Sequence, residues 1–226
     1  MKEYEKSLEF WDELLSKGEP EKIKDLIKIA PEFDETMATF SESCPTVLDF
    51  GCGNGVLLYQ CQAFGHLKKG LGIDPAAKVI KTNQETAKLS GYDNLEFIVG
   101  TADSLHNIAD ESYSGIILSN VIDVIDPVLV EEILEQLERI LIINGKVLLK
   151  LNPYMNKEMI EKTGGSEFSP NMIEINGILR LCNFETRYWT NLISKYFNID
   201  DYIEFAYTGA TSINRLFLLT KKTIYK

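Results

Sequence analysis

The chain has 226 residues, of which 45% are hydrophobic and 25% are charged, the composition of an ordinary globular protein with a substantial core. Lys and Arg total 23 and Asp and Glu total 34, so the formal net charge is −11. This acidity argues against nucleic acid or an anionic membrane surface as a main partner, because both require clustered cations.

The cysteines and the N-terminal segment indicate the cellular context. The four cysteines form no Cys-x-x-Cys pair and have no zinc-like spacing to the two histidines, which predicts neither a disulfide framework nor a metal site. The first residues, "MKEYEKSLEFWDELL", are charged and amphipathic where a signal peptide is apolar. No apolar run approaches the ~18 residues of a membrane span. We therefore expect a cytoplasmic protein that binds no metal and no membrane.

The first 45 residues are expected to form a helical cap. Apolar residues recur at helical spacing in two segments, Tyr4, Leu8, Trp11 and Leu15 in the first and Ile23, Leu26, Ile27 and Ala30 in the second. Gly18 and Pro20 separate these segments. The pattern predicts helices over most of residues 3–40.

From residue 46 onward, short apolar runs alternate with helical stretches. The predicted strands are 46–50, 70–73, 95–99, 114–119 and 146–151. The predicted helices between them are 56–66, 76–90 and 127–142. This alternation is typical of right-handed βαβ units, so residues 46–226 are expected to be an α/β domain with a mostly parallel sheet and helices on both faces.

The pattern loosens after residue 151. Residues 152–188 contain several glycine and proline breaks and have weak periodicity, which we interpret as an insertion or a lid-like segment. A helix over 189–196 and strands over 200–207 and 214–220 follow. The short connection between these two strands predicts an antiparallel hairpin.

The stretch "VLDFGCGNG" carries the first functional signal. Gly51, Gly53 and Gly55 follow a predicted strand and precede a predicted helix, the point at which open α/β sheets bind ligands. Glycine there allows unusual backbone dihedrals and close approach of a ligand. The spacing is neither the Gly-x-Gly-x-x-Gly of dinucleotide sites nor a P-loop. Asp49 would repel a pyrophosphate but suits a ligand that carries an ammonium group.

The second signal is an acid at the end of the next predicted strand, in "GLGIDPA". Asp74 can accept hydrogen bonds from both hydroxyls of a ribose. The structural alternative is that Asp74 caps the helix that begins near Pro75. Both roles can hold together.

With these motifs in order, the chain resembles the class I S-adenosylmethionine-dependent methyltransferases. "VLDFGCGNG", "GIDPA", "FIVGTADSL", "IILSNVIDVI" and "LERILIINGKVLLKL" have the order and spacing of that family, and they look like its small-molecule, methyltransferase type 11-like branch. The resemblance implies a Rossmann-like seven-stranded sheet with an antiparallel last strand, S-adenosylmethionine as cofactor, and a small-molecule methyl acceptor.

The same resemblance implies roles for particular residues. Asp49 and the three glycines would hold the methionine part of the cofactor, and Asp74 with Pro75 the ribose part. The residues implied beyond the third and fourth strands are Thr101, Ala102 and Asp103 beside the adenine and Asn120 and Val121 at the site. The family often has an acid where this chain has Thr101. Asp103 is a substitute for that acid or the cap of a short helix.

The acceptor side of the site is less defined by the sequence. Asp123 lies near the fourth strand tip and is a weak candidate for a base, with helix capping or solvation as the alternative. Tyr4 and Trp11 share a helical face that covers the cofactor or simply packs on the core. Arg187 and Tyr188 are candidates for an acceptor pocket, with core packing and a helix start near Thr190 as the alternative.

Two other functions remain open from the sequence. A non-catalytic protein that binds S-adenosylmethionine or S-adenosylhomocysteine would have the same motifs, because a fold and a cofactor pocket do not prove turnover. A nicotinamide-dependent oxidoreductase with a degenerate glycine loop is a weaker alternative. The sequence leaves the methyl acceptor, the methylated atom and the oligomeric state undetermined.

Overall fold

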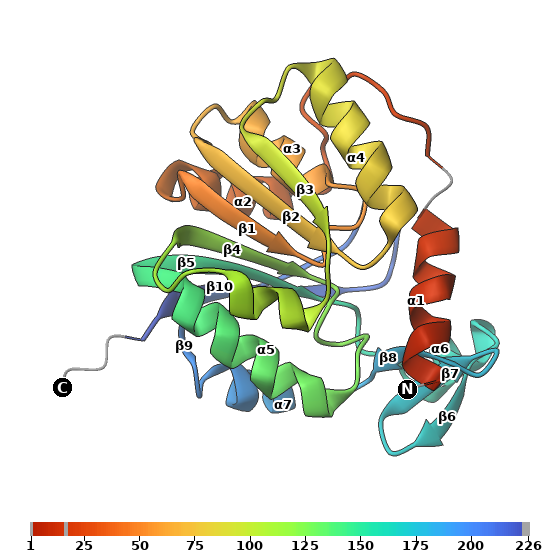
Figure 1. Ribbon diagram of the computed structural model, residues 1–226. Helices are drawn as coiled ribbons and strands as arrows, with labels where there is room; N and C mark the ends of the chain where they lie inside the picture. The colour runs from red at the N-terminus through yellow and green to blue at the C-terminus, as the bar shows by residue number, and fades with distance from the viewer. Residues whose placement is uncertain (1, 16–17, 223–226) are drawn as a thin grey trace.

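A seven-stranded sheet forms the centre of the computed structural model, which describes residues 2–15 and 18–222 (Figure 1). Its strands are β1 (Thr46–Phe50), β2 (Lys69–Asp74), β3 (Leu95–Val99), β4 (Tyr113–Ser119), β5 (Leu141–Leu151), β9 (Phe197–Phe205) and β10 (Asn214–Lys221). Their order is β3-β2-β1-β4-β5-β10-β9. Strands β1 to β5 pair in parallel, and β10 is antiparallel to both β5 and β9. The Rossmann-like sheet, its antiparallel last strand and the C-terminal hairpin are therefore confirmed.

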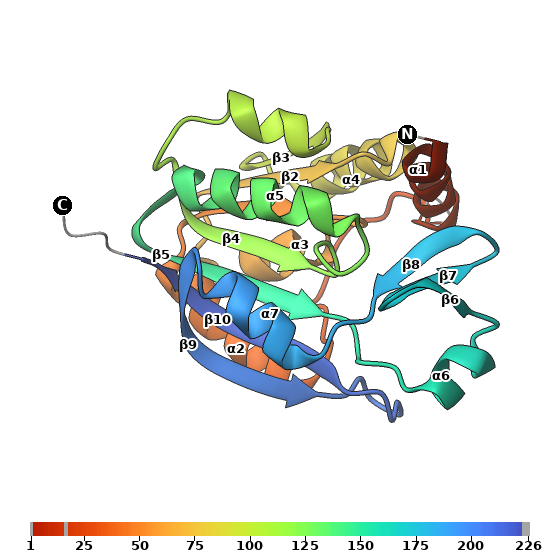
Figure 2. The same cartoon turned by 90° about the horizontal axis from the view of Figure 1, so that it is seen from below.

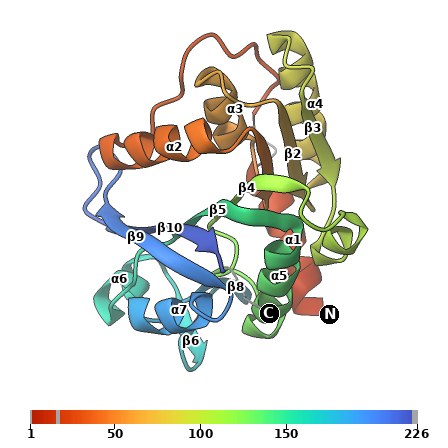
Figure 3. The same ribbon diagram turned by 90° about the vertical axis from the view of Figure 1, so that its left-hand side faces the viewer.

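Helices cover both faces of this sheet (Figure 3). The first face carries α2 (Pro31–Ser43), α3 (Val56–Ala63) and α4 (Ala77–Ser90). The second carries the 3-10 helix η1 (Ala102–Asn107), α5 (Pro127–Ile140) and α7 (Thr186–Ile193). Alternate strand residues supply the two cores: Val47 packs into the core on the first face and Leu48 into the core on the second. Both faces are buried because each parallel strand is covered on both sides.

A smaller structure lies at the carboxyl ends of the parallel strands (Figure 2). It contains α6 (Lys157–Lys162) and an antiparallel sheet of β6 (Ser166–Ser169), β7 (Met172–Ile175) and β8 (Ile178–Cys182). Helix α1 (Lys2–Leu15) packs against β8 and against α4. Asp12 of α1 accepts a hydrogen bond from the Lys78 backbone N–H at 3.2 Å. Residues from the start of the chain and from 157–182 are thus brought to one edge of the main sheet.

The segment between α1 and α2 differs from the prediction. Residues 20–30 were expected to be helical, but the structure shows no helix between Gly18 and Ala30, and α2 begins at Pro31. The segment runs over α3 and α4, where side chains satisfy its backbone. Ile23 N donates to Ser90 Oγ at 2.9 Å, and Gln60 Nε2 donates to Ile27 O at 2.6 Å. These tertiary hydrogen bonds replace the bonds that a helix would make.

Several element boundaries also differ. Helix α3 ends at Ala63, three residues before the predicted end, and α7 begins at Thr186, three residues before the predicted start. Strand β5 begins directly after α5, at Leu141, whereas the prediction began it at Lys146. Among the described residues, no helix combines the length and the apolar composition that crossing a membrane requires.

Candidate functional site

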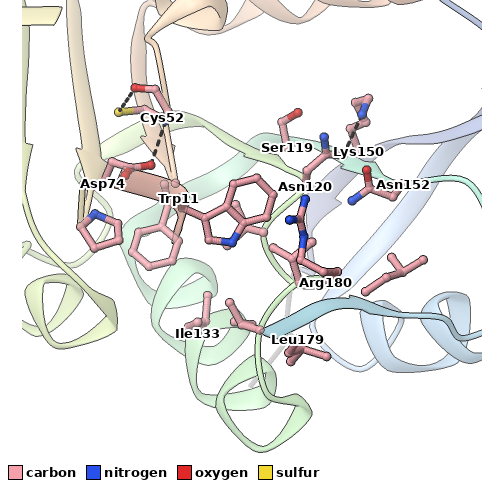
Figure 4. A pocket seen from close by; sticks show the side chains of 18 of the residues that line it. Trp11, Cys52, Asp74, Ser119, Asn120, Ile133, Lys150, Asn152, Leu179 and Arg180 are labelled. Carbon is pink, nitrogen blue, oxygen red and sulfur yellow. Dashed lines mark hydrogen bonds between the residues drawn. The ribbon is translucent and has the colours of Figure 1, made fainter. Parts of the chain in front are cut away.

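A cavity of about 930 Å³ lies at the carboxyl ends of β1, β2 and β4. Its walls come from the glycine loop with the neighbouring strand ends, from Trp11 of α1, from α5 with the loop before it, and from the segment between the end of β5 and β8. Ile29, Phe33, Tyr207 and Ser212 also line the cavity. Figure 4 shows Asp74 on one side of this cavity, Leu179 and Arg180 on the other, and Trp11 between them. The topology places the strand ends together, because parallel strands finish at the same edge of a sheet.

Asp49 is a buried carboxylate at the floor of the cavity. It is 1% exposed, and its Oδ1 has no hydrogen-bond partner among the described residues. Burial, and secondly the nearby Asp74 carboxylate, raise the pKa of Asp49 to about 8. A cation placed beside Asp49 would favour the ionised form and supply the missing partner. The Asp49 carboxylate therefore lacks the positively charged partner that would stabilise its ionised form.

The glycine loop has the backbone conformation that its sequence predicted. Gly51, Gly53 and Gly55 have φ values of +73°, +48° and +73°, in the region that side chains disfavour. Gly51 and Gly53 line the cavity, whereas Gly55, the N-cap of α3, does not. A Cβ at Gly51 would lie 2.4 Å from Cγ2 of Val121. The close approach at Gly51 is thus made by a neighbouring protein side chain, which the sequence argument did not foresee.

Asp74 connects the end of β2 to the glycine loop. Its Oδ2 accepts a hydrogen bond from Gly53 N at 2.9 Å, and its Oδ1 accepts one from Ala76 N at 2.9 Å. The N-cap of α4 is Ala76, so Asp74 is not the cap of that helix. Each carboxylate oxygen can accept a second hydrogen bond. Asp74 and Pro75 both line the cavity, so the hydroxyls of a ribose could donate to these carboxylate oxygens.

The residues after β3 divide into two groups. Thr101 and Ala102 line the cavity, but Asp103 is exposed and does not. Thr101 is the N-cap of η1 and forms a capping box with Ser104. The prediction that Asp103 replaces the family's adenine-binding acid is not supported by this geometry, and the capping role belongs to Thr101.

Asn120 and Val121 follow β4 and line the cavity. Asn120 has a φ of +56°, and its backbone N–H donates to Lys150 O at 2.9 Å. Its Oδ1 accepts a hydrogen bond from Lys150 Nζ at 2.7 Å. Burial lowers the pKa of Lys150 to about 8, and the nearby Asp123 carboxylate opposes this shift. The ends of β4 and β5 therefore place an amide and a buried amine side by side (Figure 4).

Asp123 is fully buried and does not line the cavity. Its Oδ2 accepts hydrogen bonds from the backbone N–H and the side-chain amide of Asn152, at 2.6 and 3.2 Å. Burial raises the pKa of this carboxyl, although Asn152, Lys150 and Arg215 oppose the shift. Asp123 thus fixes the end of β5, and its position does not fit the role of a base that touches an acceptor.

The four substrate-side candidates have different positions. Trp11 lines the cavity, whereas the side chain of Tyr4 lies outside the described residues. Arg187 and Tyr188 are exposed on α7, and neither lines the cavity. The ring of Tyr188 stacks on Phe184 with a centroid distance of 3.9 Å. The structure therefore does not bring Arg187 and Tyr188 to an acceptor pocket.

Sequence reasoning missed two cations that line the cavity, Lys150 and Arg180. Lys150 interrupts the apolar run "LLKL" of β5 and is 2% exposed, so a lysine inside a buried strand was an available signal. Arg180 lies on β8, in the segment whose periodicity was too weak to assign. No local pattern could have directed its side chain to the site.

The residues present fit S-adenosylmethionine. The unpartnered Asp49 carboxylate matches its ammonium group, and Asp74 has acceptor capacity for its ribose hydroxyls. Thr101 and Ala102 would flank its adenine. When bound, this cofactor supplies an activated methyl group on a sulfonium centre.

Comparison with solved structures establishes the fold. The N-methyltransferase NodS from Bradyrhizobium japonicum, in complex with S-adenosyl-L-homocysteine, is 12% identical, with 96% of this chain and 99% of that chain covered and a TM-score of 0.66. The 1,6-didemethyltoxoflavin-N1-methyltransferase from Burkholderia thailandensis is 13% identical, with 85% and 78% covered and a TM-score of 0.64. The [4+2]-cyclase SpnF is 13% identical, with 95% and 94% covered and a TM-score of 0.67.

The sequence itself assigns the family. No curated protein sequence matches this chain. Residues 41–189, more than half of the chain, match the family described as a methyltransferase domain. This match leaves the nicotinamide-dependent alternative without support. The chain belongs to the class I S-adenosylmethionine-dependent methyltransferases, and S-adenosylmethionine is its cofactor.

Proposed function

We propose that the protein transfers a methyl group from S-adenosylmethionine to a small-molecule acceptor bound in the part of the cavity walled by α1 and by residues 152–182. The observation that carries this proposal is the continuity of the cavity, which extends from Asp49 and Asp74 to Leu179 and Arg180. Its volume of about 930 Å³ is near the upper end of the ~300–1,000 Å³ typical of small-ligand sites. That volume leaves room for an acceptor beside the cofactor.

Orientation and exclusion of water are the main tasks of the protein in this reaction. Asp49 and Asp74 would fix the two ends of the methionine-ribose part. The acceptor side is lined mainly by apolar side chains, among them Met155, Met159, Phe168, Met172, Ile173 and Leu179. Lys150 Nζ is the better placed group to hold or take an acceptor proton, because it lines the cavity and Asp123 does not.

The remaining features fit the same proposal. Of the predicted cap, residues 1–45, only α1 would cover the cavity, because α2 packs on the first face of the main sheet. Residues 152–182 would act as the lid, joined to the cap where α1 packs on β8. The four cysteines are all buried and unpaired, which suits the reducing cytoplasm. The net charge of −11 disfavours nucleic acid as the acceptor.

Calorimetric titration of the purified protein with S-adenosylhomocysteine, beside NADH, tests the cofactor half of the proposal. We expect S-adenosylhomocysteine to bind and NADH to show no heat. Release of S-adenosylhomocysteine from S-adenosylmethionine, in the presence of a panel of small-molecule acceptors, tests turnover. Binding without turnover of any acceptor would favour the non-catalytic alternative, and binding of NADH alone would contradict the cofactor assignment.

A further inference from the structure

Arg180 is a cation on the acceptor side of the cavity. Among the side chains that the structure describes, those of residues 6, 9–14 and 18–222, none forms an ion pair or hydrogen bond with Arg180, and its Nε is buried without a partner. The other two arginines with buried side-chain groups are satisfied: Arg139 pairs with Asp110, and Arg215 donates to the carbonyls of Asn152 and Phe184. Arg180 thus lacks an acidic partner among the described side chains, in a chain that has 34 acidic and 23 basic residues.

Two aromatic rings hold the Arg180 guanidinium in place. Its central carbon lies 4.0 Å from the ring centroid of Phe10 and 4.8 Å from that of Trp11. Both rings belong to α1, which packs on β8. Stacking of this kind uses the face of the guanidinium and leaves the in-plane N–H groups available. The cation is thus positioned without being neutralised.

The direction of the side chain relates Arg180 to the acceptor. Figure 4 shows Arg180 extending from β8 toward the side of the cavity that holds Asn120 and Lys150, away from Asp74. Its surroundings on β8 are the apolar side chains of Leu179 and Leu181, which also line the cavity. Burial lowers the pKa of Arg180, an unfavourable desolvation that an anion would reverse.

On the basis of the proposed function, we propose that Arg180 binds a carboxylate of the methyl acceptor, so that the acceptor is an apolar small molecule with one carboxylate group. A guanidinium and a carboxylate match in charge and in bidentate geometry. A phosphate monoester would bring about 1.5–2 negative charges. The nearby Lys150 Nζ already donates to Asn120 Oδ1, so a single negative charge suits the site better.

The test uses matched probes that differ only in the anionic group, titrated into protein saturated with S-adenosylhomocysteine. The pairs are octanoate with octanamide, indole-3-acetate with indole-3-acetamide, and benzoate with benzamide, and phenyl phosphate is added as a separate arm. We expect at least one carboxylate to bind about tenfold to a hundredfold more tightly than its amide, the range for a hydrogen bond to a charged group. Phenyl phosphate should bind no better than benzoate.

Three variants separate the roles of Arg180. Arg180→Met keeps an apolar side chain packed against the rings of α1 and should abolish the carboxylate preference. Arg180→Lys keeps the positive charge and should keep part of this preference. Arg187→Met is the matched control, because Arg187 is an exposed arginine outside the cavity and its loss changes the net charge equally. Circular dichroism and the Tm report folding of each variant. The affinity for S-adenosylhomocysteine should stay within about threefold of wild type in all three.

Four results would overturn the inference. These are the absence of any carboxylate preference in wild type, a preference that survives Arg180→Met, tighter binding of phenyl phosphate than of benzoate, and a loss of S-adenosylhomocysteine affinity in Arg180→Met equal to the loss of carboxylate affinity. The last result would assign Arg180 to the carboxylate of the cofactor. Failure of wild type to bind S-adenosylhomocysteine would instead contradict the proposed function, so the two failures are distinguishable.

Discussion

At the scale of single residues, the most informative group is the Asp49 carboxyl. Burial raises its pKa to about 8, and the titratable groups around it, Asp74 and the thiols of Cys52 and Cys61, offer no positive charge. A buried carboxylate without a counter-ion lowers the stability of the free protein. Under the proposed function, the ammonium group of the bound cofactor would supply the partner that Asp49 lacks.

The affinity for S-adenosylhomocysteine should depend on pH through Asp49. Below about pH 8 the free protein holds a proton on Asp49 that must leave when an ammonium group binds. The dissociation constant should therefore fall by up to about tenfold per pH unit between pH 6 and 8. Calorimetry in buffers of different ionisation enthalpy measures the released proton. Binding that is independent of pH and releases no proton would contradict this assignment.

Replacing Asp49 by Asn should weaken this binding by about tenfold to a hundredfold and remove its pH dependence, because the amide cannot pair with a charge. The stability of the free protein should rise at pH 8, because the variant no longer carries a buried charge without a partner. Since the folded-state pKa of Asp49 is raised from 3.8 to about 8, the wild-type free energy of unfolding falls as pH rises through that window. Denaturant unfolding measures this effect: between pH 5 and pH 8, the free energy of unfolding should fall less in the variant than in wild type.

At the scale of elements, the glycine loop is held by hydrogen bonds to two neighbouring side chains. Asp74 accepts the Gly53 N–H, and Asn83 Nδ2 donates to the Gly53 carbonyl at 2.7 Å. The backbone polar groups of Gly53 are thus used inside the protein. What the loop offers a ligand is its shape, beside the buried carboxylate of Asp49.

Gly51 and Gly65 form a natural pair for testing this packing. Both have positive φ, +73° and +81°, but a Cβ would clash with Val121 at Gly51 and would meet nothing within 4 Å at Gly65. Ala at Gly65 should cost only the left-handed conformation, about 1–2 kcal/mol. Ala at Gly51 should cost about 1–3 kcal/mol more and weaken S-adenosylhomocysteine binding. Equal losses of stability and unchanged binding in both variants would refute the packing argument.

At the scale of the whole molecule, the cavity depends on segments that are far apart in the sequence. Trp11 comes from α1, Asp49 from β1 and Arg180 from β8. Helix α1 is held to the main domain by the Lys78–Asp12 ion pair at 3.6 Å and to β8 by the rings over Arg180. A ligand in this cavity would contact the main domain and the smaller sheet together.

Saturation with S-adenosylhomocysteine should therefore stabilise the protein as one unit. At a ligand concentration of about 100 Kd, the free energy of unfolding should rise by about 2.7 kcal/mol, which corresponds to a Tm increase of roughly 5–11 °C for a chain of this size. Scanning calorimetry should show one transition that moves as a whole. A second transition that stays unmoved would show that the smaller sheet unfolds independently of the site.

The sequence alone determined the main sheet, and it predicted that Asp49, Gly53 and Asp74 lie together at its edge, where they line the cavity. Local patterns were sufficient there, because strand and helix periods differ and because Asp49, the glycines and Asp74 lie at fixed offsets from strand ends. Tertiary structure decided residues 20–30, whose apolar spacing suggested a helix, because Gln60 and Ser90 bond their backbone. Tertiary structure also determined which side chains line the acceptor side of the cavity. The contact of Phe10 and Trp11 with Arg180 depends on how α1 and β8 pack, and no pattern within either segment records that packing.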